Sequence, residues 1–428
     1  MSGDGVNAER RLGALRILRP LGIRDFALLW TGMTVSLLGD GIYFVTIAWQ
    51  VYELSNAPTA LSIVGLSWTL PLALFVLLGG VISDRFDRRR VMVIADILRG
   101  LAIAAIGVLA VSGELELWHL VVLVAFYGAG EALFMPSFTA IVPDIVPRDL
   151  LVEANSLDIF VRTMTARMAG PAIGGVAIGA FGTGGAFLLD AATFGVSALA
   201  LLAMSSRPLV VREPTSVFAD VAEGLRFVRS QTWLWGTLAA ASITLLCFYG
   251  PWEVLIPYVV KNELGGSARD LGFVFGAGGL GAVLSSLVMS QRSLPRKHIT
   301  FMYGAWTVSG FAIVGYGVAA EIWHAMVAAL FAGGLGNAGM IVWMTLMQTR
   351  VPSTLLGRVS SLDWFVSVGL IPVSFALTGP IAGAVGARET LVGAGLLAGS
   401  ITFAFLFLPG MRDLERDSVA EVISDPNA

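Results

Sequence analysis

The chain has 428 residues, of which 56% are hydrophobic and only 13% are charged, with 27 basic and 30 acidic side chains. Soluble proteins carry about 25% charged residues, and the uncharged apolar runs 54–83, 299–320 and 325–349 exceed the length of about 18 residues that indicates a membrane span. This composition excludes a soluble globular protein, and the single cysteine, Cys247, excludes a disulfide within the chain.

Apolar runs between charged or Pro/Gly-rich breaks predict an all-α membrane protein with twelve transmembrane helices. In the first half we expect them near 26–52, 58–82, 91–112, 117–142, 151–180 and 184–205. In the second half we expect them near 233–260, 270–291, 299–320, 322–348, 354–385 and 389–409. The predicted domains are an N-terminal segment 1–25, a six-helix bundle 26–205, a linker 206–232, a second six-helix bundle 233–409 and a tail 410–428.

The basic residues predict the orientation of these helices. An even number of spans places both chain ends on one side of the membrane, and most of the 27 basic residues fall on that side. Only Lys261, Arg269 and Arg388 are expected on the other side. Because cytoplasmic loops are enriched in Lys and Arg, we expect a multi-pass protein of the inner cell membrane with both termini in the cytoplasm.

The linker contains an amphipathic pattern. Phe218, Val221, Leu225 and Val228 fall on one face of a predicted helix, with charged residues on the others. We expect this helix to lie on the cytoplasmic surface, either as a simple tether or with a regulatory role.

An internal repeat relates the two halves. Residues 146–160 read VPRDLLVEANSLDIF and residues 351–365 read VPSTLLGRVSSLDWF, so that eight of fifteen positions match without a gap. Each stretch opens the fifth predicted helix of its half. The repeat predicts two pseudo-symmetric six-helix bundles, with the substrate site between them near the membrane midplane and transport by rocking of one bundle against the other.

The loop after the second predicted helix carries Gly80, then Asp84-Arg85, then Asp87 and a basic cluster that begins at Arg88. This pattern resembles the signature loop of the major facilitator superfamily, in which a glycine takes the place of Asp87. Together with the repeat, the resemblance covers essentially the whole chain. The resemblance is to the twelve-helix branch of this superfamily, whose members export drugs, macrolides and siderophores by proton antiport. The resemblance also implies the major facilitator fold.

Gly80, Asp84, Arg85 and Arg88 form the predicted gating motif. Asp84 can face the positive end of a helix in the other half, and Arg88 can pair with an acid such as Asp144. Contacts that exist only when the cytoplasmic side is closed would bias the conformational equilibrium. The alternative is that the arginines only set the topology.

The fifth predicted helix contains Gly170, Pro171, Gly174 and Gly175. This segment resembles the glycine-rich motif in helix 5 of antiporters of the superfamily, and the resemblance implies export. Small residues let two helices approach closely, and proline bends a helix. Generic tight packing is the alternative, because the eleventh helix has a related Gly379-Pro380 pair.

Several ionisable residues fall inside predicted spans, where they are costly and normally face a cavity or a partner. Asp40, Glu131 and Arg167 lie deep in helices 1, 4 and 5. We predict that Asp40 and Glu131 bind protons or a cationic substrate, with Arg167 as their countercharge. A static buried ion pair is the alternative. Asp190 and Glu253 are expected nearer the outer surface, where they line the exit or lie at an interface.

Two further features lie at similar depths. Asp158 and Arg162 are four residues apart on one helical face and can pair with each other. Aromatic and methionine side chains can line an apolar substrate pocket or pack between helices; the candidates are Tyr43, Phe44, Trp68, Tyr127, Phe134, Trp252, Met340 and Trp343.

These features predict a secondary active transporter that exports small amphipathic molecules by proton antiport. A proton-coupled importer of a small metabolite on the same fold is the alternative. An intramembrane enzyme is disfavoured because HExxH and GxSxG are absent, and a primary pump because no lysine follows a glycine. We expect a monomer in the lipid bilayer whose partners are a small-molecule substrate and protons, with no cofactor, metal or nucleic acid.

Overall fold

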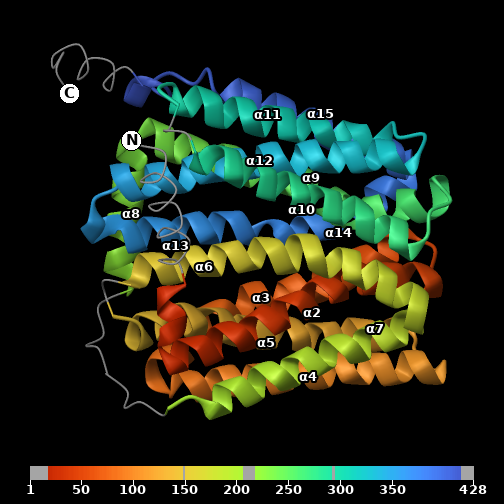
Figure 1. Ribbon diagram of the computed structural model, residues 1–428. Helices are drawn as coiled ribbons and strands as arrows, with labels where there is room; N and C mark the ends of the chain where they lie inside the picture. The colour runs from red at the N-terminus through yellow and green to blue at the C-terminus, as the bar shows by residue number, and fades with distance from the viewer. Residues whose placement is uncertain (1–17, 148–149, 206–216, 292–294, 416–428) are drawn as a thin grey trace, which may run out of the picture. The chain divides into compact units, whose positions relative to one another are not determined.

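The computed structural model describes residues 18–147, 150–205, 217–291 and 295–415, and every regular element within these ranges is a helix (Figure 1). The chain separates into two units. Unit 1 comprises Met1–Gln50 and Ser67–Arg212, and unit 2 comprises Val51–Leu66 and Glu213–Ala428.

Unit 1 contains most of α2 and α3 and the five helical elements that follow them. The bounds are α2 Arg24–Leu54, α3 Pro58–Arg85, α4 Arg88–Ser112, α5 Leu117–Ile145, α6 Leu151–Arg162, a π-helical segment Thr163–Ala169, and α7 Gly170–Ala203. A hydrophobic core joins α2, α4, α5, α6 and α7.

Unit 2 holds the remaining helices. The bounds are α8 Val217–Ser230, α9 Thr232–Tyr258, a π-helical segment Val259–Glu263, α10 Ala268–Ser290, α11 His298–Gly317, α12 Ile322–Arg350, α13 Ser353–Gly369, α14 Ile371–Val385 and α15 Ala387–Phe405. A second hydrophobic core includes residues of α8, α9, α11, α12 and α13.

The described helices can be matched to the twelve predicted spans. Ten stretches are long and apolar enough to cross a membrane. One of these, Glu153–Ala203, has 51 residues and is interrupted at Gly182, whose φ of 71° and ψ of 174° are not helical, so it supplies two spans. The predicted span 389–409 corresponds to α15, whose 19 residues extend over about 28 Å at 1.5 Å per residue.

The boundary between the units differs from the boundary between the predicted bundles, because residues 51–66 group with unit 2. The hydroxyl of Tyr52 donates a hydrogen bond to the backbone oxygen of Val254 at 2.6 Å. A Cβ placed on Gly379 would lie 2.6 Å from the Cα of Thr59, so α14 and the start of α3 touch through their backbones. Consequently α2 and α3 are each shared between the two units.

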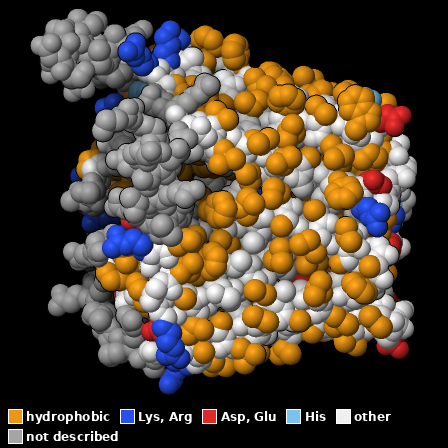
Figure 2. All heavy atoms as spheres, viewed as in Figure 1, with side chains coloured by type: hydrophobic (Ala, Val, Ile, Leu, Met, Phe, Trp, Pro, Cys, Tyr) orange, Lys and Arg blue, Asp and Glu red, His pale blue; other side chains and the backbone are white. Residues whose placement is uncertain are grey.

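The helix surfaces are apolar. Leu101, Phe181, Leu199 and Phe365 are between 65% and 73% exposed. Figure 2 shows hydrophobic side chains along the helices and most Lys and Arg side chains near helix ends. Exposure of so much apolar surface is unfavourable in water but favourable against lipid chains, as expected for transmembrane helices.

The signature loop orders the start of α4. Asp87 is the N-cap of this helix and accepts hydrogen bonds from the backbone N–H groups of Arg89 and Arg90, at 3.0 and 3.4 Å. The guanidinium of Arg89 donates to the backbone oxygens of Leu202 and Met204 at the end of α7, at 2.9 and 2.7 Å. Asp87, which occupies the place of the family glycine, therefore has a local role as a helix cap.

Arg88 forms an ion pair with Asp144, as predicted. It also donates to the backbone oxygen of Ala140 at 3.2 Å. Because α4 and α5 both belong to unit 1, this pair joins two helices of one unit, and its formation does not require closure between the halves, contrary to our expectation. Gly80 and Asp84 lie in α3, but their side chains are outside the described structure.

The repeat extends further than the matching segments indicate. Residues 146 and 351 are 205 positions apart, and the same spacing relates α5 to α12, which are both 29 residues long. Glu116 and Glu321 precede these helices, and their backbone N–H groups donate to the Nδ1 atoms of His119 and His324 at 3.0 and 3.1 Å. Equivalent positions thus make equivalent contacts.

The predicted linker helix is present as α8. Val228 is buried, whereas Leu225 is 37% exposed, so the apolar face is only partly covered. Gly224 lies against Arg358 and Leu362 of α13, and Glu223 pairs with Arg358. The side chains of Phe218 and Val221 are outside the described structure.

Candidate functional site

A cluster of ionisable side chains occupies the interior of unit 1. It draws on four helices, with Asp40 from α2, Asp96 and Arg99 from α4, Glu131 from α5 and Asp190 from α7. The charge of Arg99 acts on all four acids. We call these five residues the acidic cluster.

Arg99 and Asp96 form the enclosed part of the cluster. The Nη2 atom of Arg99 lies 2.5 Å from the Oδ1 atom of Asp96, one helical turn earlier, and both side chains are at most 5% exposed. The guanidinium carbon lies 4.4 Å from the ring centre of Phe134 and 4.7 Å from that of Phe194. The arginine is thus held between a carboxylate and two aromatic faces.

Asp40 and Glu131 form the accessible part of the cluster, because both side chains are only half-buried. Asp40 accepts a hydrogen bond from the hydroxyl of Tyr127 at 2.8 Å. Glu131 accepts one from the indole N–H of Trp68 at 2.7 Å. Each acid therefore has one neutral hydrogen-bond donor, and its side chain is partly exposed.

Asp190 is fully buried on α7. The hydroxyl of Thr193 lies 3.4 Å from its Oδ1 atom. Among the described residues, its Oδ2 atom has no hydrogen-bond partner, and the same holds for Oδ2 of Asp96. A Cβ on Gly39 would overlap Asp190 and Thr193, so the glycine beside Asp40 lets α7 approach α2.

The motif of the fifth span brings helices together beside this cluster. A Cβ on Gly170 would lie 2.7 Å from the Cα of Gly41, and one on Gly174 would lie 2.9 Å from the Cα of Ile42. Both contacts fall next to Asp40. The glycines therefore allow direct backbone packing of α7 against α2 at the depth of the acidic cluster.

The charges of the cluster do not balance. The cluster holds four carboxyl groups and one arginine, Arg99, and Arg162 of α6 adds a second positive charge that acts on Asp40 and Glu131. Unpaired charge is costly in a membrane interior. An arrangement with more acids than arginines is therefore suited to hold protons that exchange with solvent.

One of the predicted site residues, Arg167, occupies a position different from that expected. It lies in the π-helical segment and its side chain is exposed, whereas the positive charges that act on Asp40 come from Arg99 and Arg162. Asp190 is buried within the acidic cluster. Glu253 is half-buried on α9 and belongs to unit 2.

Four of the eight predicted lining residues are buried within the units. Tyr43 is stacked on Tyr127 with ring centres 4.9 Å apart, and both are buried. Phe134 and Trp343 are also buried, while Phe44, Trp68 and Trp252 are half-buried and Met340 is 48% exposed. Packing between helices, the alternative we considered, therefore describes at least four of them.

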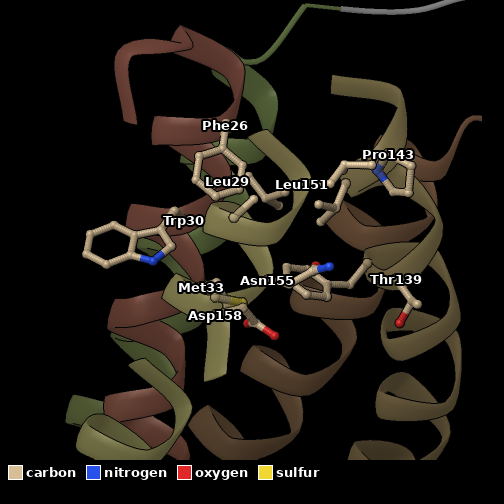
Figure 3. Close-up of a pocket in the computed structure, with 12 residues that line it drawn as sticks. Phe26, Leu29, Trp30, Met33, Thr139, Pro143, Leu151, Asn155 and Asp158 are labelled. Atoms are coloured by element: carbon tan, nitrogen blue, oxygen red, sulfur yellow. The ribbon is translucent and has the colours of Figure 1, made fainter. Parts of the chain in front are cut away.

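A cavity of about 280 Å³ opens between α2, α5 and α6 of unit 1 (Figure 3). Figure 3 shows Trp30 and Met33 on one side, Thr139 and Pro143 on the other, and Asp158 near Met33. None of the eight predicted lining residues contributes to this cavity. Its lining residues are Phe26, Leu29, Trp30, Met33, Phe138, Thr139, Val142, Pro143, Leu151, Ala154, Asn155 and Asp158.

Sequence reasoning missed Asp96 and Arg99 as site residues. Their spacing of three within an otherwise apolar helix was a usable signal, because such residues share one helical face and can neutralise each other. The described residues contain no group of three or more His, Cys, Asp or Glu side chains that could hold a metal ion.

Known proteins resemble the chain along nearly its whole length. A family model described as transmembrane secretion effector matches residues 16–427. The multidrug efflux pump Tap of Mycolicibacterium fortuitum is 29% identical over 411 residues, which cover 92% of this chain and 97% of Tap. The enterobactin exporter EntS of Salmonella typhi is 25% identical over 401 residues, which cover 91% and 93%.

A solved structure shares the fold. The bacterial homologue of the iron transporter ferroportin, in its inward-facing state, aligns with a TM-score of 0.64 at 15% sequence identity. The alignment covers 90% of this chain and 99% of that one.

Proposed function

The chain belongs to the transmembrane secretion effector family of the major facilitator superfamily, and from this membership we propose that it exports small amphipathic molecules by proton antiport. It is a multi-span membrane transporter and not an enzyme. The proposal takes it to be a monomer of the inner membrane with both termini in the cytoplasm.

One observation carries the antiport part of the proposal: Asp40 and Glu131 are half-buried in the acidic cluster, which holds four carboxyl groups and one enclosed arginine. The two accessible acids are the ones that can exchange protons with solvent. Arg99, held by Asp96, supplies a positive charge beside these acids. Proton occupancy of Asp40 and Glu131 therefore depends on small changes in their distance from Arg99.

Alternating access would couple this occupancy to transport. In the proposed cycle the bundles 26–205 and 233–409 rock against each other, and the acids face one side of the membrane at a time. A proton enters from the outer side, where proton activity is higher, and leaves towards the cytoplasm as substrate binds. The inward proton movement then drives the outward substrate movement.

The substrate class follows from the relatives. Tap is a multidrug efflux pump and EntS is an enterobactin exporter. Both are exporters that match more than nine-tenths of this chain, which supports export over import. We extend to this chain the transport of amphipathic compounds of drug or siderophore type.

Inverted membrane vesicles test the proposal. With an acidic interior, vesicles that contain the wild-type chain should accumulate an exported substrate and release protons as they do so. Control vesicles lack the chain, and a second control collapses the proton gradient with a protonophore. Accumulation that survives collapse of the gradient would contradict proton antiport. Uptake only by right-side-out vesicles, driven by outside acid, would instead establish import.

A further inference from the structure

A carboxylate and an aromatic ring hold a cation in unit 1. Both oxygens of Asp158 accept hydrogen bonds from Nε of Arg162, each at 3.0 Å. The guanidinium carbon of Arg162 lies 5.1 Å from the ring centre of Phe138. One Nη atom also lies 3.7 Å from the sulfur of Met33. Together these side chains surround a guanidinium with a negative charge and apolar, polarisable groups.

The repeat places two of these three groups at equivalent positions of unit 2. At the spacing of 205 residues, Asp158 corresponds to Asp363, and Phe138 corresponds to Trp343. The third position differs, because Arg162 corresponds to Ser367. Unit 2 thus keeps the acid and the aromatic ring and lacks the arginine.

The two side chains that unit 2 retains, Asp363 and Trp343, are in contact. The indole Nε1 atom of Trp343 donates to Oδ2 of Asp363 at 3.4 Å. Trp343 is itself fixed by an edge-to-face contact with Trp233, with ring centres 5.9 Å apart. Among the described residues, no lysine or arginine lies within ion-pair distance of Asp363. Its only identified polar partner there is a neutral N–H group.

The position of Asp363 inside a predicted membrane span makes the absence of an ion-pair partner significant. α13 begins at Ser353, and Asp363 lies within the predicted span 354–385, about 8 Å further along the helix than Arg358, which pairs with Glu223 of α8. The side chain is half-buried and therefore reachable from outside the protein core. A carboxylate inside a membrane span normally has a partner.

We propose that Asp363 and Trp343 bind the cationic group of an organic cation, at the position in unit 2 where unit 1 holds Arg162. Unit 1 demonstrates that this arrangement accommodates a planar cation beside the acid and the ring. The inference rests on the proposed export function only in identifying the cation as a transported substrate. It predicts a preference for amphipathic monocations such as guanidinium and ammonium compounds.

Equilibrium binding of tetraphenylphosphonium to the full chain in lipid nanodiscs tests the inference. The wild-type chain should bind one cation, and Asp363→Asn should weaken binding by about tenfold or more, because a hydrogen bond or ion pair to a charged group is lost. Asp363→Glu should retain most of the affinity. The matched variant Asp158→Asn, at the equivalent position of unit 1, should bind within about twofold of wild type.

Two reciprocal substitutions exchange the residues that the two units carry at this equivalent position. Ser367→Arg supplies unit 2 with the arginine of unit 1 and should block cation binding as strongly as Asp363→Asn. Arg162→Ser removes that arginine from unit 1 and should raise the stoichiometry from one cation per chain to two. The second result is a gain, so it cannot arise from a variant that fails to fold.

Three results would contradict the proposal. Failure of the wild-type chain to bind tetraphenylphosphonium or ethidium, or equal weakening by Asp158→Asn and Asp363→Asn, would overturn the proposal. Unchanged binding in Ser367→Arg would overturn it as well. Because binding is measured without a proton gradient, these results are independent of whether the vesicle experiments support proton antiport.

Discussion

The Nη2 atom of Arg99 lies 2.5 Å from Oδ1 of Asp96, and this pair is enclosed between the rings of Phe134 and Phe194. It supplies a fixed positive charge inside a membrane domain, beside the accessible acids Asp40 and Glu131. The electrostatics of the proposed proton site therefore depend on a pair that solvent barely reaches.

Arg99→Ala should destabilise the protein and abolish active export. It leaves Asp96 buried without its partner, and breaking a buried ion pair in this way costs about 3–5 kcal/mol. Thermal unfolding in detergent measures the loss. The matched control is Arg167→Ala, which removes an exposed arginine of the same unit. Equal destabilisation by both variants would contradict the assigned role of Arg99.

Asp40→Asn and Glu131→Gln should uncouple transport. Each keeps the shape of the side chain but removes a group that can release a proton, so proton-driven accumulation should fall by about tenfold or more. Exchange of labelled for unlabelled substrate, which needs no net proton movement, should be better retained. The two reactions are compared in the same reconstituted vesicles. Normal coupling in both variants would eliminate these acids as the proton site.

Gly170→Ala should weaken the packing of α7 against α2. The new Cβ would lie 2.7 Å from the Cα of Gly41, and such overpacking costs about 1–3 kcal/mol. Gly179→Ala is the control on the same helix, because no atom lies within 4 Å of the added Cβ. Thermal stability should fall only in the first variant. A similar change in both would mean that the close approach has no energetic role.

Asp87→Ala should lower stability by about 1 kcal/mol, because the N-cap of α4 loses its hydrogen bonds to Arg89 and Arg90. Asp87→Gly, which restores the family residue, should lower the free energy of unfolding by only a few tenths of a kcal/mol, because glycine is itself an acceptable N-cap. Urea or thermal titration of the two variants in parallel distinguishes them. If the glycine variant is the less stable one, the capping explanation is wrong.

More of the fold than of the candidate site could be predicted from the sequence. The spans were predictable because apolar runs of this length have only one stable arrangement in lipid, in which the backbone groups pair within helices. Asp40 and Glu131 were found for a related reason: depth along a helix follows from counting residues. Their neighbours were not predictable, because a helix with apolar residues on all faces gives no signal for which face turns inward.

Arg167 shows a second limit. A regular helix would have fixed its direction relative to the residues before it, but Thr163–Ala169 is π-helical, and the wider turn changes the direction of the side chains that follow. This π-helical irregularity was not readable from composition.

The sharing of α2 and α3 between the units has a mechanical consequence. Each helix leaves one unit and enters the other without a break, near residues 50 and 66. Any displacement of unit 1 against unit 2 must therefore bend both helices there, or release the hydrogen bond of Tyr52 to Val254 and the contact of Thr59 with Gly379. Both contacts lie within unit 2, so they attach the segment that joins α2 to α3 to that unit.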